Sequence, residues 1–152
     1  METTTIQNVT AINVIPVKKV VYTGKVQVTG GRDGYAKSDD GRLQIDLTSP
    51  GATGIGTNPE QLFAAGWSAC FIGAMTLNAA KLKLTLPADL RVDTEVDLAT
   101  GEDGYFLQAR LNVTLPGMPL QAAHALVEAA HQTCPYSKLS KGNINVQINV
   151  AI

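Results

Sequence analysis

The sequence predicts an α+β fold, in which antiparallel strands pack against helices. Stretches of alternating apolar and polar residues, the period typical of half-buried strands, recur along the 152-residue chain. They occupy residues 25–28, 42–47, 91–98, 107–113 and 144–150. Glycine-rich turns separate neighbouring strands, and two segments of helical character interrupt the series, so adjacent strands are expected to pair antiparallel.

The first helix is expected to begin after Asn58 and to end near Lys81. Asn58 is a favourable N-cap, Pro59 suits the first helical position, and Gln61 stands three residues after the cap, as in a capping box. The segment is rich in alanine, leucine and methionine, which favour helix, and Lys81 places a cation at its C-terminal end.

A second helix is expected over residues 119–131, followed by the strand at 144–150. Its apolar residues share one face at helical spacing: Leu120, Ala123, Val127 and Ala130. Pro135, in "TCPY", marks either a break or the first position of another short turn. No linker or repeat divides the chain, so residues 1–152 are expected to form one domain, with residues 1–12 as an N-terminal extension.

Composition argues against several classes of partner. Twelve Lys and Arg balance 13 Asp and Glu, for a net charge of −1, and the basic residues are scattered. We therefore expect neither nucleic acid nor an anionic membrane surface as a partner. The N-terminus has no basic region ahead of an apolar run, so a cytoplasmic location is expected.

The first helical segment carries twenty residues without a formal charge, 61–80, which nominally reaches the length of a membrane span. Polar and small residues interrupt this run, however, and the amphipathic strands around it need a core to cover. A helix that is apolar almost all round is more simply the centre of a globular fold or of an obligate dimer.

The two cysteines, Cys70 and Cys134, lie 64 residues apart and form neither a disulfide framework nor a paired zinc pattern. A cysteine within an apolar helix is usually inert packing, because burial raises the pKa of a thiol. For Cys70 to react, a cation must reach it from a distant segment, since the helix dipole fades within the first turn. Cys134 is expected at a partly exposed helix end, either without a role or as a second thiol that meets the first.

The residues alone leave other sites open. His124 and His131 lie near Cys134 in the sequence, and a zinc site with both cysteines is conceivable, although the spacing matches no structural zinc pattern. A Cys–His hydrolase that uses Cys70 and His131 is a further alternative. The expectation is that the protein holds no metal and no bound cofactor.

Three motifs, "TGGRDG", "GTNPEQLFAAGWSACFIGAM" and "HQTCPYSKLSKGNINV", together resemble the organic hydroperoxide resistance branch of the OsmC/Ohr family. The resemblance implies an intertwined homodimer, with antiparallel sheets packed around long central helices and active sites at the subunit interface. It also implies a thiol peroxidase that reduces alkyl and fatty-acid hydroperoxides and is recycled by dihydrolipoamide or a lipoylated protein.

The resemblance assigns roles to four residues. Cys70 matches the peroxide-reactive cysteine and Cys134 the resolving cysteine, so a Cys70–Cys134 disulfide is implied. Arg32 matches the arginine that stabilises the thiolate, and Glu60 the carboxylate that holds this arginine. Bulky apolar residues around Cys70 are candidates to line a pocket for the alkyl chain, although each could equally be plain core: Leu62, Phe63, Trp67, Phe71 and Met75.

Three features depart from the family pattern, and one of them is the N-terminal extension, which has no counterpart in the family. The loop at residues 49–57 is shorter than usual, and Trp67 stands where a smaller residue is common, so substrate access is expected to differ. A non-enzymatic protein that binds a lipid or another small molecule, and a redox sensor, remain the alternatives from other functional classes.

Overall fold

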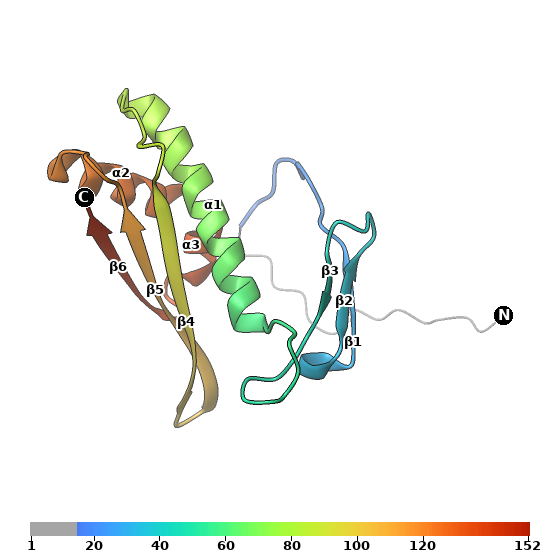
Figure 1. The fold of residues 1–152 in the computed structure, drawn as a ribbon. Helices are drawn as coiled ribbons and strands as arrows, with labels where there is room; N and C mark the ends of the chain where they lie inside the picture. Colours follow the sequence, from blue (N-terminus) through green and yellow to red (C-terminus); the bar gives the residue numbers. More distant parts are fainter. Residues whose placement is uncertain (1–14) are drawn as a thin grey trace.

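The computed structural model describes residues 15–152, and the expected N-terminal extension at residues 1–12 lies outside them. Two three-stranded sheets lie on either side of the long helix α1 (Pro59–Leu82), as Figure 1 shows. The first sheet contains β1 (Val26–Thr29), β2 (Tyr35–Ser38) and β3 (Gln44–Asp46). The second contains β4 (Arg91–Gly101), β5 (Gly104–Thr114) and β6 (Asn145–Ala151). The expected α+β class is confirmed.

Helix α1 begins as the sequence predicts. The side chain of Asn58 accepts a hydrogen bond of 2.9 Å from the backbone N–H of Gln61, and Pro59 opens the first turn. The helix ends at Leu82, and its C-cap Lys83 adopts a left-handed conformation with φ of 55° and donates its N–H to the carbonyl oxygens of Ala79 and Ala80. The capping signals therefore fix both ends of the helix that carries Cys70.

The second sheet supplies the wall against which the helices pack. β4 and β5 form an antiparallel hairpin whose register runs from Arg91 opposite Thr114 to Gly101 opposite Gly104. Alternate residues of β5 point into the core, where Leu111 and Val113 are fully buried. β6 runs parallel to β5, whereas the sequence led us to expect antiparallel pairing, because the chain crosses over through two helices before it returns.

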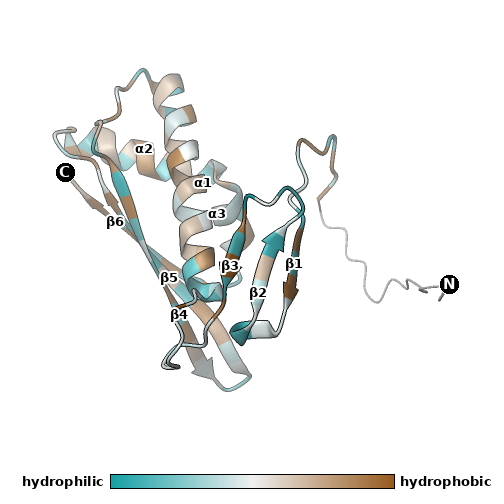
Figure 2. Cartoon of the chain, turned by 45° about the vertical axis from the view of Figure 1, so that its right-hand side comes forward, coloured by the Kyte–Doolittle hydropathy of each residue, from teal (hydrophilic) through white to brown (hydrophobic). Residues whose placement is uncertain are grey.

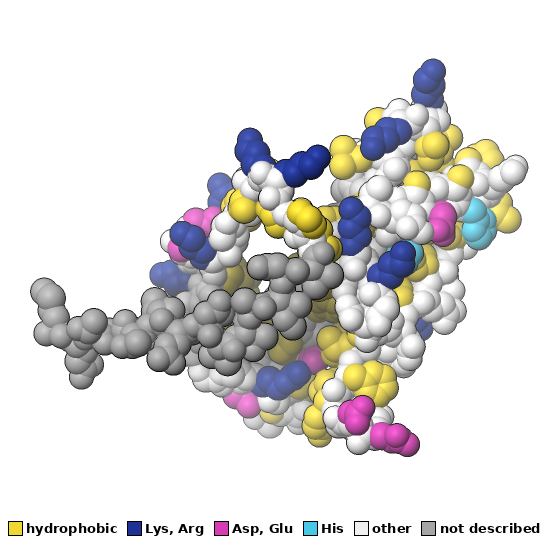
Figure 3. Space-filling model, turned by 180° about the vertical axis from the view of Figure 1, so that it is seen from behind, with side chains coloured by type: hydrophobic (Ala, Val, Ile, Leu, Met, Phe, Trp, Pro, Cys, Tyr) yellow, Lys and Arg dark blue, Asp and Glu magenta, His cyan; other side chains and the backbone are white. Residues whose placement is uncertain are grey.

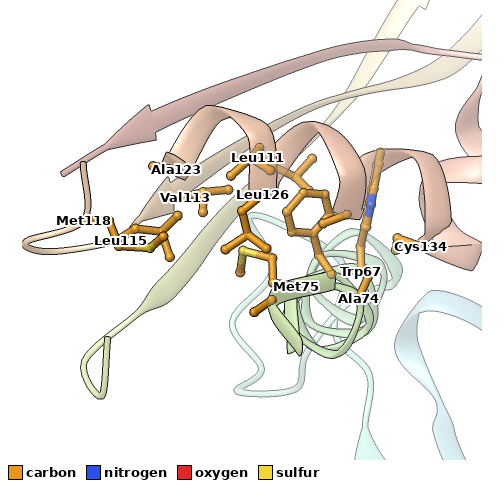
Figure 4. Close-up of a cluster of buried hydrophobic side chains, with 14 of the residues drawn as sticks. Trp67, Ala74, Met75, Leu111, Val113, Leu115, Met118, Ala123, Leu126 and Cys134 are labelled. Carbon is orange, nitrogen blue, oxygen red and sulfur yellow. The ribbon is translucent and has the colours of Figure 1, made fainter. Parts of the chain in front are cut away.

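Those helices are α2 (Leu120–Thr133) and α3 (Pro135–Ser140), and both contact α1. Pro135 is the first residue of α3, so the break after Cys134 starts a new short helix. α1 and α2 cover the inner face of the β4–β5–β6 sheet, and α3 packs against both helices. The core lies between them, as Figure 4 shows, with Met75, Leu111 and Leu126 among its buried members.

The first sheet stands apart from this body in Figure 1, and Figure 2 shows hydrophobic residues, in brown, on β1. Its three strands pair with one another, and strand β1 leaves Val26 and Val28 about half exposed, at 52% and 53%. Strand β2 is the middle strand of this sheet, and the sequence pattern did not predict it. The sheet is tied to α1 through its loops, by the contacts described below.

Helix α1 satisfies the length and hydropathy criteria for a membrane span, with a mean hydropathy of 1.4 over its most apolar window. In this structure one side of the helix packs against β4, α2 and α3, as a core helix does. The opposite side is open, with Leu77 68% exposed.

Candidate functional site

Cys70 lies in the middle of α1 and faces the junction between α2 and α3. Cys134 lies at that junction, where it is both the C-cap of α2 and the N-cap of α3. The two sulfur atoms are 3.4 Å apart, within reach of an S–H hydrogen bond, and both thiols are free. Residues 64 positions apart in sequence are thus brought into contact, as the resemblance implied.

Cys134 is fully buried, which corrects the expectation of partial exposure. The reason is the break before Pro135, because the chain turns there from α2 into α3 and directs the side chain of Cys134 at α1. Figure 4 shows Cys134 at the end of the core, beside Trp67. Cys70 keeps some exposure and is the more accessible of the two thiols.

The surroundings of Cys70 disfavour its thiolate. Burial raises the pKa of the Cys70 thiol, the backbone N–H of Tyr136 acts in the opposite direction, and the neighbouring Cys134 raises the pKa further. A single chain in this arrangement therefore leaves the thiol mostly protonated at neutral pH. A reactive Cys70 needs an additional positive charge.

Arg32 and Glu60 form a two-pronged ion pair. Arg32 donates from Nη1 to Oε2 of Glu60 at 2.9 Å and from Nη2 to Oε1 at 2.7 Å. The hydrogen bonds from Arg32 hold the pKa of Glu60 below its ordinary value, although partial burial opposes this shift. The pairing of residues 28 positions apart, expected from the resemblance, is confirmed.

A tight turn presents Arg32 to the helix. Gly30 and Gly31 adopt left-handed conformations, with φ of 72° and 60°, which residues other than glycine rarely adopt. Asp33 fastens the turn to the loop before α1, because its carboxylate accepts hydrogen bonds from the backbone N–H and the hydroxyl of Ser49, at 2.9 and 2.8 Å. Glu60 stands in the first turn of α1.

The structure does not bring the ion pair to the thiols within one chain. Across residues 15–152, no hydrogen bond joins Arg32 to Cys70, and both arms of the guanidinium are engaged by Glu60. Glu60 and Cys70 are ten positions apart, which corresponds to about 15 Å along the helix axis. The four residues therefore form two separate pairs.

The five pocket candidates fall into two groups. Trp67, Phe71 and Met75 have no exposed surface and belong to the core. Phe63 is partly buried and packs near Trp67 and Tyr136, while Leu62 is 37% exposed. A role in binding an alkyl chain stays a prediction for all five.

Three residues next to the cysteines were not singled out from the sequence: Asn78, Tyr136 and Ser137. Asn78 is buried and donates to Oγ1 of Thr133 at 2.8 Å, and Ser137 is buried and accepts from Trp67. Asn78 had a visible signal, since a polar side chain within an apolar run needs a partner when it is buried. The sequence gives no comparable signal for Tyr136 and Ser137, apart from their position just after Cys134.

The histidines stand outside this arrangement. Nδ1 of His131 is buried without a hydrogen-bond partner, and the described part of the chain shows no hydrogen bond from His131 to Cys70. The same residues contain no group of three His, Cys, Asp or Glu side chains close enough to share a metal ion. A cavity of about 370 Å³ opens beside Glu60, between the start of α1 and β4, with Ala64, Val96 and Leu98 in its walls.

Known proteins are similar to this chain over most of its length. The family model for OsmC-like proteins matches residues 51–149. An organic hydroperoxide resistance protein of Xanthomonas axonopodis pv. citri is 46% identical over 138 residues, which cover 88% of this chain and 97% of that protein. The crystal structure of an organic hydroperoxide resistance protein from Legionella pneumophila is similar with a TM-score of 0.83 and 40% identity, over 88% of this chain and 100% of the other. That of OhrB of Bacillus subtilis has a TM-score of 0.81 and 39% identity, over 86% and 99%.

Proposed function

Since this chain belongs to the OsmC-like family, we propose that it protects the cell against organic hydroperoxides by reducing them, with Cys70 as the reactive thiol. The observation that carries the proposal is the 3.4 Å contact between the sulfur atoms of Cys70 and Cys134. Two free thiols at this distance are poised to become one disulfide. A binding protein would have no need of such a pair.

The reaction takes place in two steps. The Cys70 thiolate attacks the distal oxygen of the hydroperoxide, the O–O bond breaks, and the alkoxide takes a proton and leaves as an alcohol. Cys70 is then a sulfenic acid. The Cys134 sulfur attacks Sγ of Cys70, the S–O bond breaks, and water leaves with the thiol proton. The protein loses two electrons and gains a Cys70–Cys134 disulfide.

The first step needs a cation, and within residues 15–152 of one chain no Lys or Arg contributes to the pKa shift of Cys70. We propose a homodimer in which the Arg32–Glu60 pair of one chain approaches Cys70 of the other. The guanidinium would favour the thiolate and the negative charge that develops on the leaving oxygen. Glu60 would orient Arg32, because Arg stays protonated and the forked geometry of the pair fixes its plane.

The open side of α1 supports this dimer. Its residues are small or apolar and remain exposed in the single chain: Leu62, Ala65, Ala69, Gly73 and Leu77. Cys70 lies at the border of this face. An exposed apolar face of this kind marks an interaction site, and small residues allow a second backbone to approach closely. The exposed valines of β1 offer further apolar surface for the partner.

Mixing two inactive variants tests whether the site is shared. A Cys70→Ser chain and an Arg32→Ala chain each lack one part of every site. If Arg32 acts across the interface, a mixed dimer holds one complete site, and refolding the two together restores about a quarter of the wild-type activity per chain. If Arg32 acts within its own chain, the mixture stays inactive.

The substrate is proposed to be an alkyl or fatty-acid hydroperoxide, with Leu62 and Phe63 as the pocket residues that remain accessible. Dihydrolipoamide or a lipoylated protein would reopen the disulfide by thiol exchange. We propose a cytoplasmic location, and no nucleic-acid partner. In Figure 3, Lys and Arg side chains are spread over the face that is seen rather than gathered into one basic patch.

Turnover with different reductants tests the activity. The reduced protein should consume cumene hydroperoxide catalytically with dihydrolipoamide, and faster than with glutathione. A non-enzymatic binding protein would retain a fatty acid and leave both thiols reduced after a peroxide challenge. A redox sensor would form the disulfide once without turnover.

A further inference from the structure

The segment that carries Cys134 is fastened to α1 on both sides of the cysteine. Before it, Oγ1 of Thr133 accepts a hydrogen bond of 2.8 Å from Nδ2 of Asn78. After it, Oγ of Ser137 accepts one of 3.1 Å from Nε1 of Trp67. Both donors belong to α1, the helix that carries Cys70, and they lie on either side of Cys70 in sequence.

The donors of both links are buried, and so is the acceptor Ser137, whereas the acceptor Thr133 is exposed. Trp67 has no exposed surface, Ser137 is 1% exposed, and Asn78 is 7% exposed. Leaving a buried donor without an acceptor costs free energy, which favours both links. Asn78 is held further by a hydrogen bond of 2.8 Å to the carbonyl oxygen of Ala74. The Asn78 side chain is therefore held by its own helix as well as by Thr133.

We propose that Trp67–Ser137 and Asn78–Thr133 are positioning links that hold the Cys134 thiol against Cys70. The inference rests on the proposed function and deepens it, because it concerns the second chemical step. Trp67 was a candidate for the substrate pocket, and its position in the core gives it this different task. The indole ring packs in the core while its N–H fixes the start of α3.

Two reactions compete for the Cys70 sulfenic acid. Condensation with the Cys134 thiol gives a disulfide and water. Reaction with a second hydroperoxide transfers another oxygen to sulfur, which gives a sulfinic acid and an alcohol. The first reaction depends on how often the two sulfurs meet, and the second depends on the peroxide concentration. The links favour the disulfide because they keep the 3.4 Å approach populated.

Removal of one acceptor at a time tests the proposal. Ser137→Ala removes the acceptor for Trp67, and Thr133→Val removes the acceptor for Asn78 at almost constant shape. Ser140→Ala is the matched control, since Ser140 is also a buried serine of α3, but its hydroxyl donates to the carbonyl oxygen of Ser137 within that helix rather than to α1. Thr133→Ser, which keeps the hydroxyl, should restore the wild-type behaviour.

The readout separates the two chemical steps. One equivalent of cumene hydroperoxide should be consumed at the wild-type rate by every variant. In Ser137→Ala and Thr133→Val, disulfide formation should be slowed roughly fivefold, the free-energy equivalent of one hydrogen bond. A sulfenic-acid trap such as dimedone should then label Cys70 more, and mass spectrometry should detect the sulfinic acid at correspondingly lower peroxide. Wild-type rates of disulfide formation in both variants would overturn the proposal.

A second measurement is independent of peroxide chemistry. In a buffer of reduced and oxidised dithiothreitol, the equilibrium between the two thiols and the Cys70–Cys134 disulfide should shift roughly fivefold toward the thiols in each variant. An unchanged equilibrium in folded variants would contradict the positioning role even if the chain were not a peroxidase. If Ser137→Ala fails to fold, Trp67→Phe removes the same hydrogen bond from its donor side and is scored in the same way.

Discussion

Arg32 and Glu60, which lie 28 residues apart in the sequence, are joined by two parallel hydrogen bonds of 2.9 and 2.7 Å. The pair connects the turn after β1 to the first turn of α1. Its geometry matches the fork of a guanidinium to both oxygens of a carboxylate, which a lysine cannot reproduce. The ion pair thus fixes where the guanidinium points before any substrate binds.

Loss of the Arg32 guanidinium should slow the reaction with peroxide. We expect Arg32→Ala to lower the second-order rate constant for an alkyl hydroperoxide by about 10²- to 10³-fold, as for the loss of one group that stabilises developing charge. Arg32→Lys keeps the charge without the fork and should recover only part of the rate. Stopped-flow kinetics measure both, with circular dichroism as the control for folding. Equal rates in wild type and Arg32→Ala would remove Arg32 from its proposed role.

The pH dependence of Cys70 alkylation should report the same cation. Burial raises the pKa of Cys70, so fewer chains carry the thiolate at neutral pH, and alkylation by iodoacetamide should accelerate only as the pH rises into the alkaline range. This profile is expected for Arg32→Ala. With Arg32 present in the proposed dimer, the midpoint should lie at lower pH. Both profiles are best measured in a Cys134→Ser background, so that Cys70 is the only thiol, and superimposable curves would contradict the proposed interaction.

Gly66 leaves room for Tyr136. A Cβ added at Gly66 would lie 2.9 Å from the hydroxyl oxygen and 3.2 Å from Cζ of Tyr136, closer than ordinary contacts. Gly66→Ala should therefore destabilise the fold by about 1–3 kcal/mol through overpacking, and should displace the chain next to Cys134. Urea denaturation measures the cost. In a Tyr136→Phe background, which removes the nearest atom, most of the cost should disappear; the same cost in both backgrounds would place the strain elsewhere.

The outer face of the second sheet carries an ion pair with a predictable acid response. Hydrogen bonds from Arg110, at 2.8 and 2.9 Å, and from Gln108 lower the pKa of Asp97 to about 2. Because this value lies below the unfolded one, the stabilisation is complete above about pH 4 and is lost as the pH falls toward 2. Asp97→Asn should thus be less stable than wild type at pH 6 and approach it at pH 3. Urea denaturation at the two values checks this, and an equal difference at both would argue against the pair.

Local signals predicted the elements that depend on local interactions. The start of α1 follows from Asn58, Pro59 and Gln61, because capping involves neighbouring residues alone. The long hairpin of β4 and β5 follows from alternation around a short turn. Strand β2 was missed because its residues, Tyr35–Ser38, do not alternate between apolar and polar. The parallel direction of β6 depends on how α2 and α3 cross the sheet.

The candidate site shows the same contrast between local interactions, which can be predicted, and long-range contacts, which cannot. Periodicity gives no sign that Arg32 meets Glu60 or that Cys70 meets Cys134; the resemblance supplied both, and the structure confirms both contacts. The burial of Cys134 escaped prediction because it results from the turn between α2 and α3, which directs the side chain inward. Polar residues that surround it suggested exposure instead.

One measurement tests the central claim that Cys70 and Cys134 form a peroxide-reactive pair. Fully reduced protein is mixed with one equivalent of cumene hydroperoxide, quenched, and analysed by intact mass and by peptide mapping without reduction. We predict a mass lower by two hydrogen atoms, a Cys70–Cys134 crosslink and one equivalent of alcohol, with Cys70→Ser inert under the same conditions. Peroxide consumption by Cys70→Ser at the wild-type rate, or thiols that stay reduced in the wild type, would contradict the claim.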